Sequence, residues 1–171
     1  MITKRIGHIL RPDKNKVNTL NYLFIFLLLC WSAGFLFPVL TPSFAGKQII
    51  NQLLGYNYSL VCHQSEPSLI KFGDAHLLVC ARCTGLYLGG LFMAILMLFN
   101  LLKLKLSLIP LIMFSAPLVI DAFAVRLNIY SYSNTIAFIT GVLCGAIVVF
   151  YILDAIKNSF NFLYKKNNEQ Q

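Results

Sequence analysis

The sequence VCARCTGLYLGG, from Val79 to Gly90, marks the point where a polar segment gives way to an apolar run. A second short motif, CHQ at 62–64, precedes it, and the two motifs with the residues between them hold three of the five cysteines and two of the three histidines. Thiols and imidazoles gathered in so few residues predict a chemical site. We expect the rest of the chain to hold this segment at a membrane surface.

The composition indicates that the chain lies in a lipid bilayer. Hydrophobic residues make up 58% of the 171 residues and charged residues only 12%, with a mean hydropathy of +0.72. A soluble domain carries about 25% charged residues. We therefore expect an integral membrane protein whose only core is its bundle of membrane helices.

Four stretches are apolar enough to cross a membrane as helices, since a bilayer core about 30 Å thick requires roughly 20 apolar residues per helix. The first stretch is longer than the roughly 7–15 residues of a signal-peptide core, so we expect it to remain as a helix. The sequence thus predicts an all-α protein with a single transmembrane domain at 19–156, a basic tail at 1–18 and a polar tail at 157–171. The predicted spans are 20–40, 84–102, 106–125 and 133–153.

Lys and Arg residues set the expected orientation, because positive charges near span ends stay in the cytoplasm. Ten of them flank the spans on one side and four on the other. This split predicts a multi-pass protein of the bacterial inner (cell) membrane, with both termini in the cytoplasm and a Cys/His loop at 43–83 outside it. The ten are Lys4, Arg5, Arg11, Lys14, Lys16, Lys103, Lys105, Lys157, Lys165 and Lys166, and the four are Lys47, Lys71, Arg82 and Arg126.

The net charge of +8 is therefore a signal of topology. We expect no nucleic-acid partner, because the basic residues form no patch interleaved with aromatic side chains. The lipid bilayer is the expected partner. A homo-oligomer or an unidentified membrane partner is also compatible with the sequence.

Residues 43–61 are too polar to span a membrane and too apolar for a free loop. Their apolar side chains recur with helical spacing at Ile49, Ile50, Leu53 and Leu54. This pattern predicts a short helix in the plane of the lipid headgroups. We expect Gly55 to end the helix, and Tyr56 and Tyr58 to anchor the next residues at the membrane interface.

Cys80 and Cys83 form a CxxC motif at the start of the second span. At i, i+3 on a helix both sulfurs project from one face. The helix N-terminus and Arg82 favour the thiolate, which is the form that binds metals and attacks substrates. Three sulfurs and one histidine would complete a tetrahedral site for zinc or another transition metal. The predicted ligands are Cys62, His63, Cys80 and Cys83, with His76 as an alternative to His63.

Other interpretations of the same cysteines stay open. A CxxC pair with a third cysteine nearby is also the equipment of a membrane thiol–disulfide oxidoreductase, which needs an attacking and a resolving sulfur. A structural disulfide in an oxidising compartment would leave one cysteine over. A non-enzymatic membrane scaffold or transporter component needs neither chemistry. The sequence contains no Walker, Rossmann or HExxH motif and does not decide whether the protein is an enzyme.

Asp121 is the one charged residue within the four predicted spans. A charge at depth costs at least about 2.5 kcal/mol unless it finds a partner or water. Since the third span is expected to run outward, Asp121 should lie about one turn from the outer surface, near the cysteines. Its simplest role is an ion pair with Arg82 or Arg126. As candidate catalytic residues, Asp121 and Arg82 would instead bind a metal, orient a histidine or move a proton.

Glycines predict which helices pack together. The second span contains Gly85-x-x-x-Gly89, with Gly90 beside it, and the fourth contains Gly141-x-x-x-Gly145. Small residues at this spacing let two helix backbones approach closely in lipid. Both spans are expected to run inward, so the pattern predicts a direct parallel contact between them.

The same motifs carry a resemblance to a known family. CHQ followed by VCARCTGLYLGG resembles the signature of an uncharacterised family of predicted bacterial membrane proteins, a domain of unknown function with the family number 2085. The resemblance covers roughly residues 62–145 and implies an integral membrane protein with a shared site, but no established activity. Downstream it continues in Pro117 with Asp121, in Ser133-Asn134 and in Thr140-Gly141.

Overall fold

The computed structural model describes residues 14–41, 47–73, 75–99 and 108–169. Four of its helices contain a stretch that is long and apolar enough to cross a membrane, which confirms the predicted all-α membrane class. These helices are α2 (Lys14–Leu40), α4 (Ala81–Leu98), α5 (Leu108–Arg126) and α6 (Asn134–Glu169). The stretches are Thr19–Leu40, Ala81–Leu98, Ile109–Arg126 and Asn134–Ser159.

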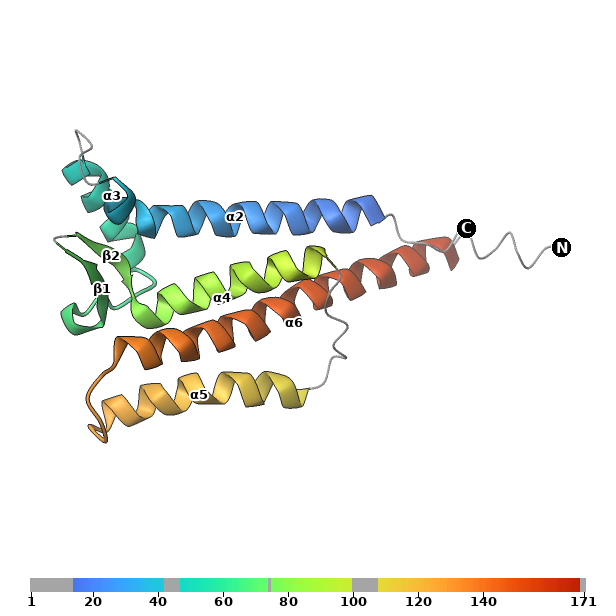
Figure 1. Cartoon of the computed structure of the whole chain (residues 1–171). Coiled ribbons are helices and arrows are strands. Elements are labelled where there is room, and N and C mark those ends of the chain that lie inside the picture. The colour runs from blue at the N-terminus through green and yellow to red at the C-terminus, as the bar shows by residue number, and fades with distance from the viewer. Residues whose placement is uncertain (1–13, 42–46, 74, 100–107, 170–171) are drawn as a thin grey trace.

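The first residues of α2 and the last residues of α6 lie toward one end of the bundle, and short elements cover the opposite end (Figure 1). We call this opposite end the hairpin end. It consists of helix α3 (Lys47–Ser59), the 3₁₀ turn η1 (Glu66–Ser68), strand β1 (Leu69–Phe72) and strand β2 (Ala75–Cys80).

Two helices extend beyond the predicted spans. α2 begins at Lys14, within the predicted basic tail, and α6 continues to Glu169, through most of the predicted polar tail. An apolar span supplies the costly helix nucleus, after which a polar sequence extends the helix at little cost. Three predicted features lie outside the described residues. They are the end of the second span at 102, the start of the third span at 106 and the basic tail up to residue 13.

The predicted Cys/His loop contains a β-hairpin that the sequence analysis did not anticipate. The strands β1 and β2 are antiparallel, with Lys71 opposite His76. Gly73 turns the chain with φ of +61°, a conformation that glycine adopts without strain. Three consecutive residues of β2, from Leu77 to Val79, are buried. The strand therefore lacks the alternating pattern that identifies a half-exposed strand in a sequence.

The predicted contact between the glycine-containing helices is present. The helices α4 and α6 both begin at the hairpin end, so they pack in parallel (Figure 1). A β-carbon at Gly89 would overlap the backbone of Val142, and one at Gly145 would overlap the backbone of Leu86. Glycine is thus required for this backbone separation. We call this contact the α4–α6 seam.

Two predictions about α3 are wrong. The helix continues through Gly55 to Ser59, and Tyr58 is buried, with 4% of its surface exposed, instead of lying at the membrane interface. The Tyr58 hydroxyl donates a hydrogen bond to the Trp31 carbonyl at 2.6 Å. A helical glycine costs about 1 kcal/mol relative to alanine, which is less than the burial of a large aromatic ring gains. Packing on α2 therefore outweighs the local signal at Gly55.

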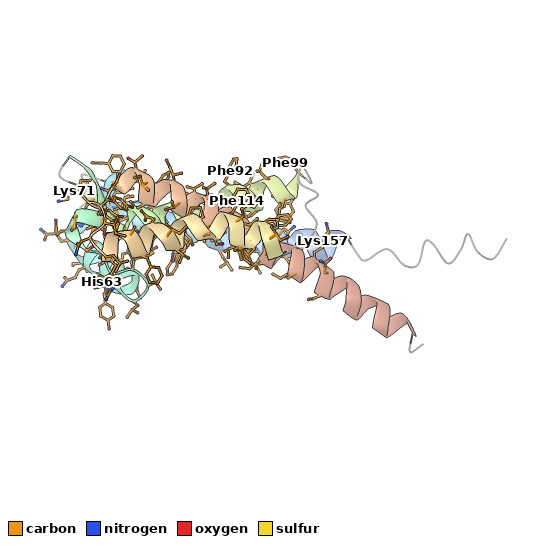
Figure 2. The ribbon with its side chains drawn as sticks, turned by 90° about the horizontal axis from the view of Figure 1, so that it is seen from below. His63, Lys71, Phe92, Phe99, Phe114 and Lys157 are labelled. Atoms are coloured by element: carbon orange, nitrogen blue, oxygen red, sulfur yellow. The ribbon has the colours of Figure 1, made fainter. Side chains whose placement is uncertain are left out.

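The bundle has a buried core and an apolar surface. Near the hairpin end, Phe35, Tyr58 and Val79 form a cluster with Cys62 and Leu78. Farther from the hairpin end, large aromatic side chains are exposed on the surface of the bundle, among them Phe92, Phe99 and Phe114 (Figure 2). A bilayer covers such side chains at no cost, because lipid tails are as apolar as they are.

Candidate metal centre

Three cysteine sulfurs meet where the hairpin end joins α4. The Sγ atoms of Cys62, Cys80 and Cys83 all lie within 4.8 Å of one another. Cys62 follows α3, Cys80 is the last residue of β2, and Cys83 lies in the first turn of α4. The hairpin brings the chain back, so that residues 18 positions apart in the sequence come into contact. We call these three residues the sulfur cluster.

The first turn of α4 fixes the two sulfurs of the CxxC motif. Cys80 is the N-cap residue, and its sulfur accepts a hydrogen bond from the backbone N–H of Cys83 at 3.5 Å. The Thr84 hydroxyl donates to the Cys80 carbonyl at 3.1 Å. The N–H groups of a first helical turn lack partners within the helix. A sulfur therefore takes the place that an oxygen cap occupies in most helices.

Cys62 is placed by hydrogen bonds from two sides. Its backbone N–H donates to the Tyr58 carbonyl at 2.9 Å, and its sulfur accepts the backbone N–H of Cys80 at 3.2 Å. The side-chain amide of Gln64 donates to the carbonyls of Gly55 at 3.2 Å and Leu78 at 2.6 Å. Gln64 thus ties α3 to β2 and holds Cys62 beside Cys80. This role of Gln64 was not predicted, although its place in the CHQ motif, directly after Cys62 and His63, is a signal for it.

Both histidines lie outside the sulfur cluster. The side chains of His63 and His76 are exposed, and among the described residues the group able to hold a metal contains three cysteines and no histidine. Figure 2 shows His63 at the edge of the hairpin end. His76 lies on β2 opposite Lys71, on the outer side of the hairpin. The structure therefore places neither of the two histidines that were predicted as a fourth ligand next to the sulfurs.

The sulfur cluster concentrates negative charge on Cys62. Hydrogen bonds from the thiols of Cys80 and Cys83 hold the pKa of Cys62 well below its usual value, against the opposing effect of burial. The backbone N–H groups of Cys80 and Gln64 add to this lowering. The hydrogen bond to Cys62 raises the pKa of the Cys80 thiol in turn. One thiolate is therefore already stabilised before any metal binds.

Arg82 points from the same turn of α4 toward α5. Its Nη2 lies 2.5 Å from Oδ2 of Asp121, whose side chain is only 4% exposed. The Tyr130 hydroxyl donates to the other oxygen, Oδ1. Of the two ion pairs that the sequence predicted, the structure contains the one with Arg82, while Arg126 is exposed. Asp121 does not belong to the sulfur cluster.

Tyr132 completes the polar surroundings of Arg82. The guanidinium lies over its ring, with Cζ 5.9 Å from the centroid. Burial is the main reason that the pKa of Tyr132 is raised, to about 12. The Tyr132 hydroxyl and Arg82 Nε are both buried and have no hydrogen-bond partner among the described residues. Tyr132 was not predicted as a site residue, because it lies in the connection between α5 and α6, outside the cysteine motifs.

An apolar groove of about 430 Å³ lies beside the site. Asn134, which belongs to the Ser133-Asn134 element of the family resemblance, borders this groove. Its other lining residues are Leu36, Ile70, Phe72, Leu77, Thr84, Leu88, Thr135 and Phe138.

Comparisons with known proteins agree with this architecture. Residues 62–151 match a family described as "Predicted membrane protein (DUF2085)", and this range begins at Cys62 and includes Cys80, Cys83 and Asp121. The chain is also similar to an uncharacterized protein of the archaeon Methanocaldococcus jannaschii, with 39% identity over 114 residues, which are 64% of this chain and 70% of that protein. No solved structure matches the chain at a significant level. Since the family match covers more than half of its residues, this chain belongs to the DUF2085 family of predicted membrane proteins.

Proposed function

We propose that this membrane protein binds one transition-metal ion, with zinc as the first candidate, through Cys62, Cys80 and Cys83 on the extracytoplasmic side of the cell membrane. The observation that carries the proposal is the approach of the three sulfurs to within 4.8 Å of one another. Three soft ligands from separate segments converge, because Cys62 follows α3, Cys80 ends β2 and Cys83 lies in the first turn of α4.

The geometry of the sulfur cluster suits a tetrahedral ion. Two sulfurs bound at about 2.3 Å in a tetrahedral arrangement lie about 3.8 Å apart, so a small inward movement of the three side chains is sufficient. Thiolates favour zinc or copper(I) over magnesium or calcium. The N–H groups of Cys80 and Cys83 that point at sulfurs would orient these ligands, as outer hydrogen bonds do in other metal sites.

The extracytoplasmic location rests on the charge distribution. Ten Lys and Arg residues flank the spans on the side of the two termini, against four on the side of the hairpin end. The first residues of α2 and the hairpin end lie at opposite ends of the bundle (Figure 1). Since basic segments remain in the cytoplasm, the sulfur cluster would face the other compartment.

Metal analysis of the full chain in detergent tests the proposal. We expect close to one zinc or similar ion per chain, and its loss in Cys80→Ser. The matched control is Cys30→Ser, because Cys30 is exposed on α2 and lies outside the sulfur cluster. Metal-free wild-type protein that also fails to take up added zinc would refute the proposal.

A thiol–disulfide oxidoreductase is the second candidate, because the same observation supports it. A disulfide between Cys80 and Cys83 would be reduced to two thiols while a partner dithiol is oxidised to a disulfide, with Cys62 as the third thiol within reach. Mass spectrometry of protein alkylated without reductant separates the two functions. A readily reduced Cys80–Cys83 disulfide in metal-free protein would favour the oxidoreductase, whereas three thiols released together with zinc would favour the metal site. A protein that is only a scaffold or a transporter component would need neither the metal nor the disulfide, so Cys80→Ser should leave its folding and its amount in the membrane unchanged.

Cysteine labelling in intact cells tests the orientation. A membrane-impermeant thiol reagent should label Lys71→Cys on the hairpin end and not Leu104→Cys, between the predicted spans 84–102 and 106–125, with the wild-type chain as the background control. The reverse pattern would place the sulfur cluster in the cytoplasm and leave the metal proposal to be judged by metal analysis alone.

A further inference from the structure

Two buried polar atoms without partners belong to Arg82, in the turn of α4 that carries Cys80 and Cys83, and to Tyr132, whose ring lies under the Arg82 guanidinium. Arg82 Nε and the Tyr132 hydroxyl are two of the four such side-chain atoms found among the described residues. Arg82 stands between Cys80 and Cys83 in the sequence and carries the guanidinium that lies over the Tyr132 ring. A buried polar group without a partner costs about 1–3 kcal/mol, and buried polar groups in proteins normally have one, so a bound group that supplies the partner would stabilise these two atoms.

The neighbouring side chains do not supply this partner. The carboxylate of Asp121 accepts from Arg82 Nη2 and from Tyr130, and neither of these bonds uses Arg82 Nε or the Tyr132 hydroxyl. Arg82 Nε can only donate, and the Tyr132 hydroxyl can donate its proton or accept a hydrogen bond, so one acceptor can take a hydrogen bond from both. The group that fits between them is therefore an acceptor, and the positive charge of Arg82 favours a negative one.

The sulfur cluster leaves one tetrahedral position for such a group. Three protein ligands and one open position distinguish a catalytic zinc site from a closed structural site. Within the described parts of the chain, the group that could hold a metal contains three sulfurs and no fourth side chain.

We propose that the metal at Cys62, Cys80 and Cys83 takes a small anionic oxygen or nitrogen donor as its fourth ligand, and that Arg82 Nε and the Tyr132 hydroxyl donate hydrogen bonds to this ligand. This inference rests on the proposed metal function. It makes the site an open one, which binds an exchangeable hydroxide or carboxylate-type ligand in place of a histidine. Arg82 and Tyr132 then select an acceptor at the metal and disfavour a neutral apolar ligand.

Cobalt(II) in place of zinc tests the inference, because its visible absorption reports the ligands around the ion. The full-length protein in detergent is loaded with cobalt and titrated with azide as the anionic probe. We expect azide to change the cobalt spectrum of the wild-type chain. In Tyr132→Phe the sulfur-to-cobalt absorption should remain, while the azide affinity falls about tenfold, the effect of one hydrogen bond to a charged ligand. Arg82→Lys, which keeps the charge and lacks Nε, should weaken azide binding at least as much.

The matched control is Tyr56→Phe, because Tyr56 lies on α3, is 71% exposed and is outside the sulfur cluster. Its azide affinity should equal that of the wild-type chain. A cobalt spectrum that azide leaves unchanged would overturn the open position and leave the metal site intact. Equal azide affinity in Tyr132→Phe and the wild-type chain would overturn the assigned donors. A chain that takes up no cobalt would overturn both proposals.

Discussion

The helices α6 and α5 are held in the bundle in different ways. Half of the apolar stretch of α6 is buried (50%), compared with 6% of that of α5. The helix α6 packs on α4 along the glycine-lined seam, whereas α5 packs on α6 and is joined to α4 through the ion pair between Asp121 and Arg82. Backbone contact thus positions α6, and a single charged group fixes the end of α5 that lies near the hairpin end. The ion pair links α5 to the turn that carries the sulfur cluster.

The largest effect is expected from filling the α4–α6 seam. In Gly145→Leu the new side chain would overlap the backbone of Leu86, which cannot move without separating the helices. We expect loss of folded protein, measured as aggregation in size-exclusion chromatography of the detergent-solubilised chain. The matched control is Gly55→Leu, because a β-carbon at Gly55 meets no atom within 4 Å. A Gly145→Leu chain that folds as well as the control would show that the seam does not hold α6.

Removing the charge of Asp121 should have the next largest effect. Asp121→Asn leaves the buried part of Arg82 without its counter-ion, and breaking a buried pair in this way costs about 3–5 kcal/mol. We expect a lower Tm in detergent with zinc content unchanged, since Asp121 lies outside the sulfur cluster. Asp154→Asn, at a site hydrogen-bonded to Asn158 on the surface of α6, is the control and should change little. Loss of zinc at an unchanged Tm would instead identify Asp121 as a metal ligand.

A smaller loss is expected from Tyr130→Phe. This change removes the hydroxyl that donates to Oδ1 of Asp121 and keeps the ring. A hydrogen bond to a charged group contributes about 1.5–3 kcal/mol, and the low end applies because Tyr130 is partly exposed. The Tm should fall by less than in Asp121→Asn. If the double variant Asp121→Asn/Tyr130→Phe loses the sum of the two single effects, the hydroxyl and the carboxylate do not act on each other.

The seam could be predicted from the sequence and the hairpin could not. The glycine spacing in α4 and α6 is a local pattern with one physical meaning in lipid, and the structure confirms it. The strand β2 gives no such pattern, because Leu77, Leu78 and Val79 are all buried and do not alternate. The burial of Tyr58 could not be predicted either. It depends on the close approach of α2 at Gly34, and no residue near Tyr58 in the sequence indicates that approach.

The same distinction applies to the candidate site. Cys80 and Cys83 are close in sequence, so helical geometry already places their sulfurs on one face. Cys62 joins them through the hairpin and through Gln64, which bridges α3 and β2. The two histidines near the cysteines favoured a histidine as the fourth ligand. In the structure His63 is exposed, and the backbone turns directly after it at Gln64, where φ is 47°. The sequence predicted an ion pair of Asp121 with Arg82 or Arg126. The choice of Arg82 depends on how α5 packs in the bundle, which the sequence does not show.

The smallest effect is expected at the outer face of α5. Phe123 lies two residues after Asp121 and is 63% exposed, so its ring faces lipid. Lipid tails solvate the ring as well as protein does, and Phe123→Ala should therefore change the stability by no more than about 0.5 kcal/mol. The control is Phe150→Ala on α6, where the ring is 1% exposed and its removal should cost about 3–5 kcal/mol. Thermal unfolding of both variants in the same detergent measures the difference. A large loss of stability in Phe123→Ala would mean that this face of α5 packs against protein, either a second copy of the chain or another membrane partner. The ion pair of Asp121 with Arg82 would then not be the main interaction that holds α5 near the hairpin end.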